Sequence, residues 1–153
     1  MRLFSRFTDI INANLNSMLN KVEQPEKMIR LIISEMEETL IEVRSSAAKN
    51  IAEQKILLRK IASTQKNIAH WHYQAEVAVA KDREDLAKLA LTEKHKFQHD
   101  GAKLEEENIV VNELLGAIQT DAQRLREKLD EAKRRQKALV LRQQSAEVRL
   151  TIR

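Results

Sequence analysis

Apolar residues recur at helical spacing near the start of the chain. Between Arg2 and Val22, nine apolar side chains project within about half the circumference of a helix drawn at about 100° per residue. The opposite face is polar and partly basic, and the polar residue Asn14 intrudes on the apolar side. This pattern predicts an amphipathic helix. It fits two interpretations: a helix in the plane of a membrane surface, or a helix packed on the rest of the protein.

On the membrane interpretation, apolar side chains enter the lipid interface and basic residues border them. The predicted membrane-binding residues are Arg2, Leu3, Phe4, Arg6, Phe7, Ile10, Ile11, Leu15, Met18 and Leu19. Gln24 and Pro25 then interrupt the pattern, because proline disfavours helix in the residue before it and is itself favoured at a first helical position. We therefore expect residues 1–24 to form a membrane-binding helix with its linker, and a second element to begin near Pro25.

Two longer regions carry the heptad spacing of a coiled coil. In the first, apolar residues fall at seventh positions between residues 29 and 78, with interruptions at Asn50, Gln54 and Thr64. In the second, they do so between residues 90 and 150. The sequence therefore predicts two long helices that bury a shared apolar seam.

The heptad spacing of apolar residues lapses between the two regions, which predicts the tip of a hairpin near residues 81–86. Asp82 is a candidate cap for the helix that follows. Two alternatives are a turn at Asp100 and Gly101, which is a better turn dipeptide, and a single uninterrupted helix. The predicted tip residues are Asp82, Arg83, Glu84, Asp85 and Leu86.

Charge patterning favours the tip near Glu84. Residues 23–42 hold six acidic and two basic residues, a net charge of −4, and residues 124–142 hold eight basic and three acidic residues, a net charge of +5. A turn near Glu84 lays these segments against each other, whereas a turn at Gly101 or no turn leaves them apart. The predicted fold is all-α: an N-terminal amphipathic helix followed by a long antiparallel coiled-coil helical hairpin over residues 25–153.

Several apolar residues lie off the predicted seam and would face water in a single chain. We therefore expect the hairpin to self-associate into a homo-oligomer or polymer. The residues concerned are Ile32, Ile41, Leu58 and Val140.

Composition agrees with long helices and narrows the chemistry. The 153 residues are 33% charged and 3% aromatic, with two glycines, one proline and no cysteine. Such a chain offers no phosphate-binding glycine loop, no disulfide and no thiolate metal site. No apolar stretch approaches the roughly 20 residues that span a bilayer, and the first 22 residues do not have the pattern of a secretory signal.

Catalytic and ligand chemistry is correspondingly faint. The acidic residues fit a solvated helix face, so we expect no enzyme activity, no catalytic residues and no cofactor. A tip near Glu84 would bring His70 and His72 level with His95 and His99, but exposed histidines of this kind are commoner than metal sites, and we expect no metal. The basic run at residues 133–137 lacks interleaved aromatics and has an acidic counterpart, so no nucleic acid is expected.

Three stretches resemble the phage shock protein A family in order and spacing. They are residues 3–14 (LFSRFTDIINAN), 35–44 (EMEETLIEVR) and 83–87 (REDLA). The resemblance covers essentially the whole chain. The family includes the vesicle-inducing protein of plastids and is similar to the membrane-remodelling ESCRT-III proteins, so the predicted hairpin is ESCRT-III-like.

The resemblance implies a bacterial stress-response scaffold. Such a protein is cytoplasmic and peripherally associated with the inner face of the cytoplasmic membrane, where it binds and stabilises or remodels damaged anionic membranes. The alternative that it implies is negative regulation of transcription, in which the hairpin binds and inhibits an AAA+ activator. Family members usually continue into further helices, and this chain stops at Arg153 in heptad register, so we expect it to be part of a longer protein.

Overall fold

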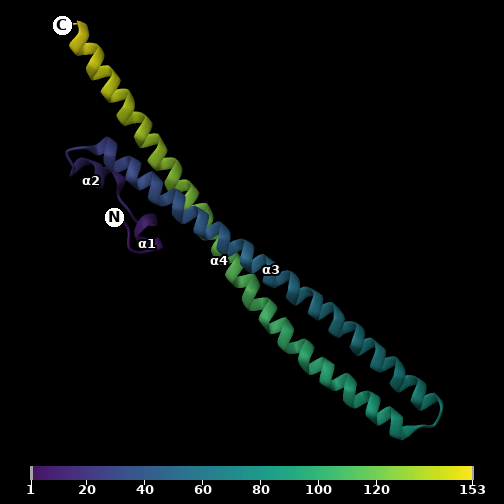
Figure 1. Ribbon diagram of the computed structural model, residues 1–153. Coiled ribbons are helices and arrows are strands. Elements are labelled where there is room, and N and C mark those ends of the chain that lie inside the picture. Colours follow the sequence, from purple (N-terminus) through teal and green to yellow (C-terminus); the bar gives the residue numbers. More distant parts are fainter. Residues whose placement is uncertain (1, 153) are drawn as a thin grey trace. The chain divides into compact units, whose positions relative to one another are not determined.

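A computed structural model describes residues 2–152, and of Ile152 only the backbone. The outermost residues of the two predicted segments, Met1 and Arg153, lie outside this range. Four helices follow one another along the chain: α1 (Phe7–Ile11), α2 (Leu15–Asn20), α3 (Pro25–Ala80) and α4 (Glu84–Ile152). Within residues 2–152 there is no strand. The all-α prediction is confirmed, and α3 and α4 pack against each other as a hairpin (Figure 1).

Helix α3 begins at Pro25, as its sequence predicts, because a proline nitrogen has no hydrogen to leave unpaired in the first turn. The backbone N–H of Met28 donates to the carbonyl of Gln24 at 3.1 Å and closes that turn. The polypeptide then continues as helix for 56 residues. No proline or glycine interrupts it over that length.

The hairpin tip lies where the sequence predicts it, and the alternative turn at Asp100 and Gly101 is wrong because both residues lie inside α4. Asp82, expected to cap α4, instead ends α3. Its φ of 55° is in the left-handed region. The N–H of Arg83 donates to the carbonyl of Ala78 at 2.8 Å, and that of Asp82 to Val79 at 3.1 Å. This is the Schellman arrangement, which satisfies the last carbonyls of a helix.

The other tip residues open α4. Glu84 and Asp85 lie in its first turn, where carboxylates favour the positive end of the helix dipole. The pKa of Asp85 is lowered, first because Arg83 donates two hydrogen bonds to its carboxylate at 3.2 and 3.3 Å, and then because the N–H of Leu86 donates to it. The structure thus places Asp82 and Arg83 in the turn, and Glu84, Asp85 and Leu86 on the helix.

The chain divides into two compact units. The first contains the residues up to Ala47 and those from Ile118 onward, and the second contains Ala48–Ala117. In the second unit the seam contains small and polar side chains as well as Leu57 and Leu115. Gln54 donates to Asn112 from helix to helix. A Cβ added at Gly101 would lie 3.3 Å from Cγ2 of Thr64, so a glycine fits the close approach of the two helices there.

In the first unit the seam is more apolar, and two expectations about it need correction. Ile32, predicted to face water, is 0% exposed, because residues before α3 pack over that side of the helix. Ala146 and Leu150, predicted to continue the seam, are exposed. Ile41 and Val140 in this unit are exposed, as predicted. Leu58, in the second unit, is exposed as well.

The acidic and basic segments predicted to face each other both belong to the first unit. Glu37 and Lys133 line the same grooves. Within residues 2–152, however, no ion pair joins the two segments. Glu131 instead pairs along α4 with Lys128 at 3.3 Å and Arg135 at 3.4 Å. The opposite charges therefore lie near one another without forming ion pairs, and the apolar seam holds the two helices together.

The two glycines of α4 lead to opposite expectations for substitution by alanine. Nothing lies within 4 Å of a Cβ at Gly116. Gly116→Ala should therefore raise the free energy of unfolding by about 0.5 to 1 kcal/mol, the difference in helix propensity. Gly101→Ala should gain less, because the new methyl meets Thr64. Chemical denaturation at a single protein concentration measures both, and a larger gain for Gly101→Ala would contradict the packing described.

Candidate membrane-binding segment

The N-terminal segment, residues 2–22, is not the single helix that its periodicity predicts. Its first residues are not helical, and α1 and α2 follow with a break at residues 12–14. Asn14, the residue that intrudes on the apolar face, explains the break. Its side-chain oxygen accepts the N–H of Ser17 at 3.0 Å and so caps α2. Asparagine favours this position over a helix interior, so a new helix begins where the old one would have continued.

Helix α1 is held by a second local device. Asp9 accepts a hydrogen bond from the hydroxyl of Ser5 at 2.8 Å and another from the backbone N–H of Arg6 at 3.1 Å. These bonds close the turn from the extended chain into the helix. Helices of five and six residues are too short to be stable alone, so packing must hold them in place.

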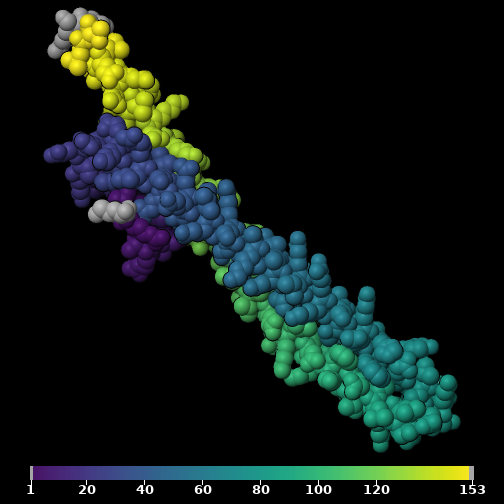
Figure 2. Space-filling model, viewed as in Figure 1, coloured from purple at the N-terminus to yellow at the C-terminus, as the bar shows by residue number. Residues whose placement is uncertain are grey.

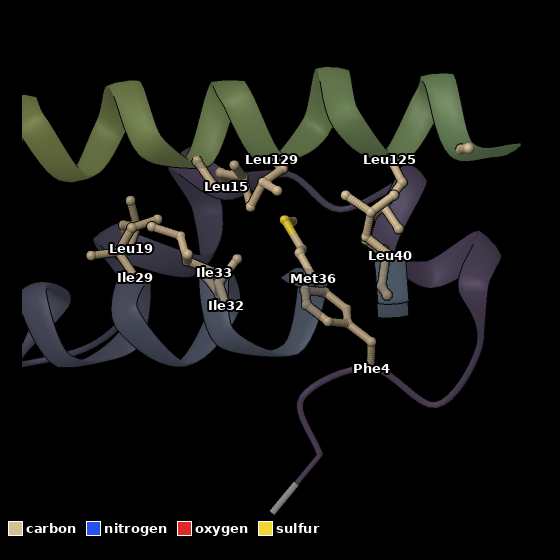
Figure 3. Close-up of a cluster of buried hydrophobic side chains, with 13 residues drawn as sticks. Phe4, Leu15, Leu19, Ile29, Ile32, Ile33, Met36, Leu40, Leu125 and Leu129 are labelled. Atoms are coloured by element: carbon tan, nitrogen blue, oxygen red, sulfur yellow. The ribbon is translucent and has the colours of Figure 1, made fainter. Parts of the chain in front are cut away.

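That packing uses the apolar residues predicted to enter a membrane. Phe4, Ile10, Leu15 and Leu19 are buried in one cluster with side chains of α3 and α4 (Figure 3). The α3 and α4 members of the cluster are Ile29, Ile32, Ile33, Met36, Leu40, Ala122, Leu125, Leu129 and Ala132.

The predicted membrane-binding residues divide by exposure. Leu3, Phe7, Ile11 and Met18 pack against the cluster and are partly buried. Arg2 and Arg6 are exposed. The purple residues lie against the first part of α3 in Figure 2. Of the two interpretations of the periodicity, the structure therefore displays the packed form, in which the apolar residues are hidden from a membrane.

Polar contacts add to the docking at both ends of the segment. The carboxylate of Glu35 on α3 accepts the backbone N–H of Leu3 at 2.8 Å and that of Phe4 at 2.9 Å. On the α2 side, the guanidinium of Arg135 donates to the side-chain oxygen of Asn16. Glu35 was not among the residues predicted for the site, because a side chain that binds backbone N–H groups leaves no pattern in the sequence of its partner.

The histidines considered for metal binding lie on the two arms of the hairpin. At the hairpin arms, His72 contacts Glu76 at 2.8 Å and Lys94 at 3.0 Å, so the two arms are level there as expected. Among residues 2–152 no three His, Cys, Asp or Glu side chains are grouped to hold a metal ion. Within residues 2–152, no helix is both long enough and apolar enough to cross a membrane.

The fold and the docked segment together define a class of protein: a helical hairpin that carries an amphipathic segment at its start. A sequence profile of the PspA/IM30 family matches residues 2–153. The chain belongs to the PspA/IM30 family.

Individual relatives agree with this assignment. The chain is 32% identical over 142 residues to the membrane-associated protein Vipp1 of Nostoc punctiforme, a match that covers 93% of this chain and 55% of that protein. It is 29% identical to the membrane-associated protein VIPP1, chloroplastic, of Arabidopsis thaliana, and the match covers 95% of this chain and 44% of that protein. It is 27% identical to a phage shock protein A homolog of Deinococcus radiodurans, and the match covers 99% of this chain and 68% of that protein. The chain thus spans about half the length of the two Vipp1 relatives.

The docking can be tested with a substitution that shortens one buried side chain. Leu15 is 1% exposed, and Leu15→Ala should weaken docking by about 2 to 5 kcal/mol, the usual range for such a truncation in a core. Trypsin should then cut faster after Arg6 and Lys21. Thr8→Ala, on an exposed position of α1, is the matched control and should leave the cleavage rate unchanged. Equal rates for Leu15→Ala and the unmodified chain would show that the segment is not held by this cluster.

Proposed function

We propose that this protein is a peripheral membrane protein of the stress response, and that its N-terminal segment binds anionic lipid surfaces. In this proposal the segment leaves its docking site and forms one continuous amphipathic helix in the membrane interface. The hairpin of α3 and α4 stays folded and serves as the scaffold. Its place is the inner face of the cytoplasmic membrane, where it stabilises or remodels damaged bilayers without catalysing a reaction.

The observation that carries the proposal is the position of the segment outside the two long helices. α3 begins at Pro25 and makes its own first-turn hydrogen bond, so it does not need residues 2–22 for its backbone pairing. The segment is attached through apolar contacts and the hydrogen bonds of Glu35 and Arg135. It can therefore undock without unfolding the hairpin. Family membership and the names of the Vipp1 relatives, which are membrane-associated, support the same function.

Electrostatics then decides where the segment goes. The apolar residues are buried in the docked form, so an interface must offer more than apolar contact to compete. Arg2, Arg6 and Lys21 each gain about 1 kcal/mol near an anionic surface, and Asp9 subtracts from this sum. We therefore expect reversible binding to anionic vesicles that weakens as salt rises, and little binding to neutral ones.

A pair of charge substitutions tests the insertion. Phe7→Glu places a carboxylate in the middle of the apolar arc and should abolish co-sedimentation of the full chain with vesicles rich in phosphatidylglycerol. Asn12→Glu adds the same charge on the polar face and should weaken binding only about fivefold, the effect of one charge near the surface. Asn16 is unsuitable as the control because it contacts Arg135.

The contrary outcomes are plain. Equal binding to neutral and anionic vesicles, or equal loss for Phe7→Glu and Asn12→Glu, would leave residues 2–22 as a packing element only. Phe4→Glu adds a further check. It should undock the segment, because Phe4 is in the core, and still prevent binding.

We further propose that the protein self-assembles through apolar side chains that the chain itself leaves uncovered. Ile41 is 65% exposed, and Leu58 and Val140 are about half exposed at 49% and 44%. Single apolar residues on a surface are common, but these recur along both long helices. The regulatory role that the family resemblance implies, inhibition of an AAA+ activator, stays a prediction.

Light scattering measures the assembly. At tens of micromolar we expect species larger than one chain, and the double variant Ile41→Gln, Leu58→Gln should shift them toward the monomer, because it removes apolar area that association would bury. Lys49→Gln, Lys55→Gln is the control, since both lysines are exposed and contribute no apolar patch. A strictly monomeric unmodified chain at that concentration would contradict the proposal.

A further inference from the structure

Glu35 occupies an unusual position for a coiled-coil carboxylate. Both of its oxygens accept backbone N–H groups from the start of the chain, Oε2 from Leu3 at 2.8 Å and Oε1 from Phe4 at 2.9 Å. Both hydrogen bonds are partly buried, and the residues that they join are more than 30 positions apart in the sequence. A charged acceptor strengthens a hydrogen bond, so this contact is the strongest polar link described between the N-terminal segment and α3.

The surroundings of Glu35 are acidic and face basic residues. Glu38 and Glu42, on the same side of α3, line a hollow together with Arg2 and Arg6. In the docked form these two basic side chains are therefore exposed beside a group of carboxylates. The apolar side chains of the segment are needed in both places, because the docked form buries them in the cluster and the proposed membrane-bound form inserts them in lipid, so the segment cannot be docked and inserted at once.

The two backbone groups held by Glu35 have a further property. If residues 2–22 become one helix, the N–H groups of Leu3 and Phe4 fall in its first turn, where no carbonyl of the same helix can accept them. Phosphate oxygens of lipid headgroups are suitable acceptors for such groups. The transfer from docked to membrane-bound segment thus exchanges carboxylate oxygens for headgroup oxygens, without leaving either N–H group unpaired.

We propose that Glu35 is the latch of the N-terminal segment: its carboxylate holds the segment closed on α3 through the backbone of Leu3 and Phe4, and an anionic lipid surface opens it. The inference rests on the proposed function, because it names the residue that regulates membrane binding. It adds that affinity for lipid is set partly by a residue on α3 that touches no lipid. A protein that is open only part of the time binds with an affinity reduced by the open fraction.

The contact is tested first without lipid. Glu35→Gln keeps the shape of the side chain, but its amide nitrogen cannot accept the second N–H. Hydrogen exchange over residues 3–12 of the full chain should then quicken by about tenfold, as expected for loss of a hydrogen bond to a charged group. Glu38→Gln is the matched control, since it removes one charge from the same acidic surface and receives neither of these N–H groups. Exchange in Glu35→Gln equal to that of the unmodified chain would overturn the latch.

Vesicles of phosphatidylglycerol then test the opening. Glu35→Gln should lower the lipid concentration for half-maximal binding by about tenfold, because the open fraction rises by that factor. Glu38→Gln should change it by less than about threefold, the effect of one exposed charge. An equal gain for both variants would overturn the latch in favour of a general charge effect. Faster exchange in Glu35→Gln with no vesicle binding by any variant would overturn the lipid opening and the proposed function, and would leave the Glu35 contact confirmed.

Discussion

The apolar side chains of residues 2–22 must be buried somewhere, and this requirement governs the first unit of the protein. In the structure they are buried on the side of α3 and α4 where Ile32 and Met36 would otherwise be exposed. The gain is mutual, because the segment hides its own apolar face while it covers that of the hairpin. An interface of lipid offers the segment a second site of similar character. The proposed response to a membrane would therefore need only a change in where these apolar side chains are buried.

Two features would favour release of the docked segment in the proposed function. α1 and α2 are single short turns of helix joined by a break at residues 12–14, so little backbone structure is lost when the segment leaves. The break itself depends on Asn14, which caps α2 in the docked form but sits on the apolar side of a continuous helix. The continuous helix of the proposed membrane-bound form would therefore differ in conformation from the docked segment. Glu35 and Arg135 add polar links that favour the docked form.

In the proposed exchange, the hairpin of α3 and α4 is the part that stays folded. Its tip is made by ordinary helix-ending chemistry, with Asp82 in the left-handed region and carboxylates in the first turn of α4. In the second unit the close approach at Gly101 and the hydrogen bond between Gln54 and Asn112 join the two helices. Polar seam positions of this kind set register at some cost in stability. Two basic residues of α4, Lys128 and Arg135, pair within their own helix with Glu131, and within residues 2–152 no ion pair joins the acidic and basic segments.

The sequence by itself determined the helices α3 and α4, the start at Pro25, the tip at residues 81–86 and the amphipathic character of residues 2–22. Most of these depend on near neighbours in the chain, namely heptad spacing, a proline and a lapse in the apolar spacing, and opposite charge on residues 23–42 and 124–142 selected the tip. Only the tertiary structure decided that the N-terminal segment breaks at Asn14, that Ile32 is buried and that Glu35 holds the backbone of Leu3 and Phe4. The burial of Ile32 and the Glu35 contact depend on residues far apart in the chain, and the local cap at Asn14 replaces a continuous helix only where packing holds the two short helices. A periodic pattern shows that a face must be buried, but it does not say against what, because water exclusion is non-directional and several partners satisfy it.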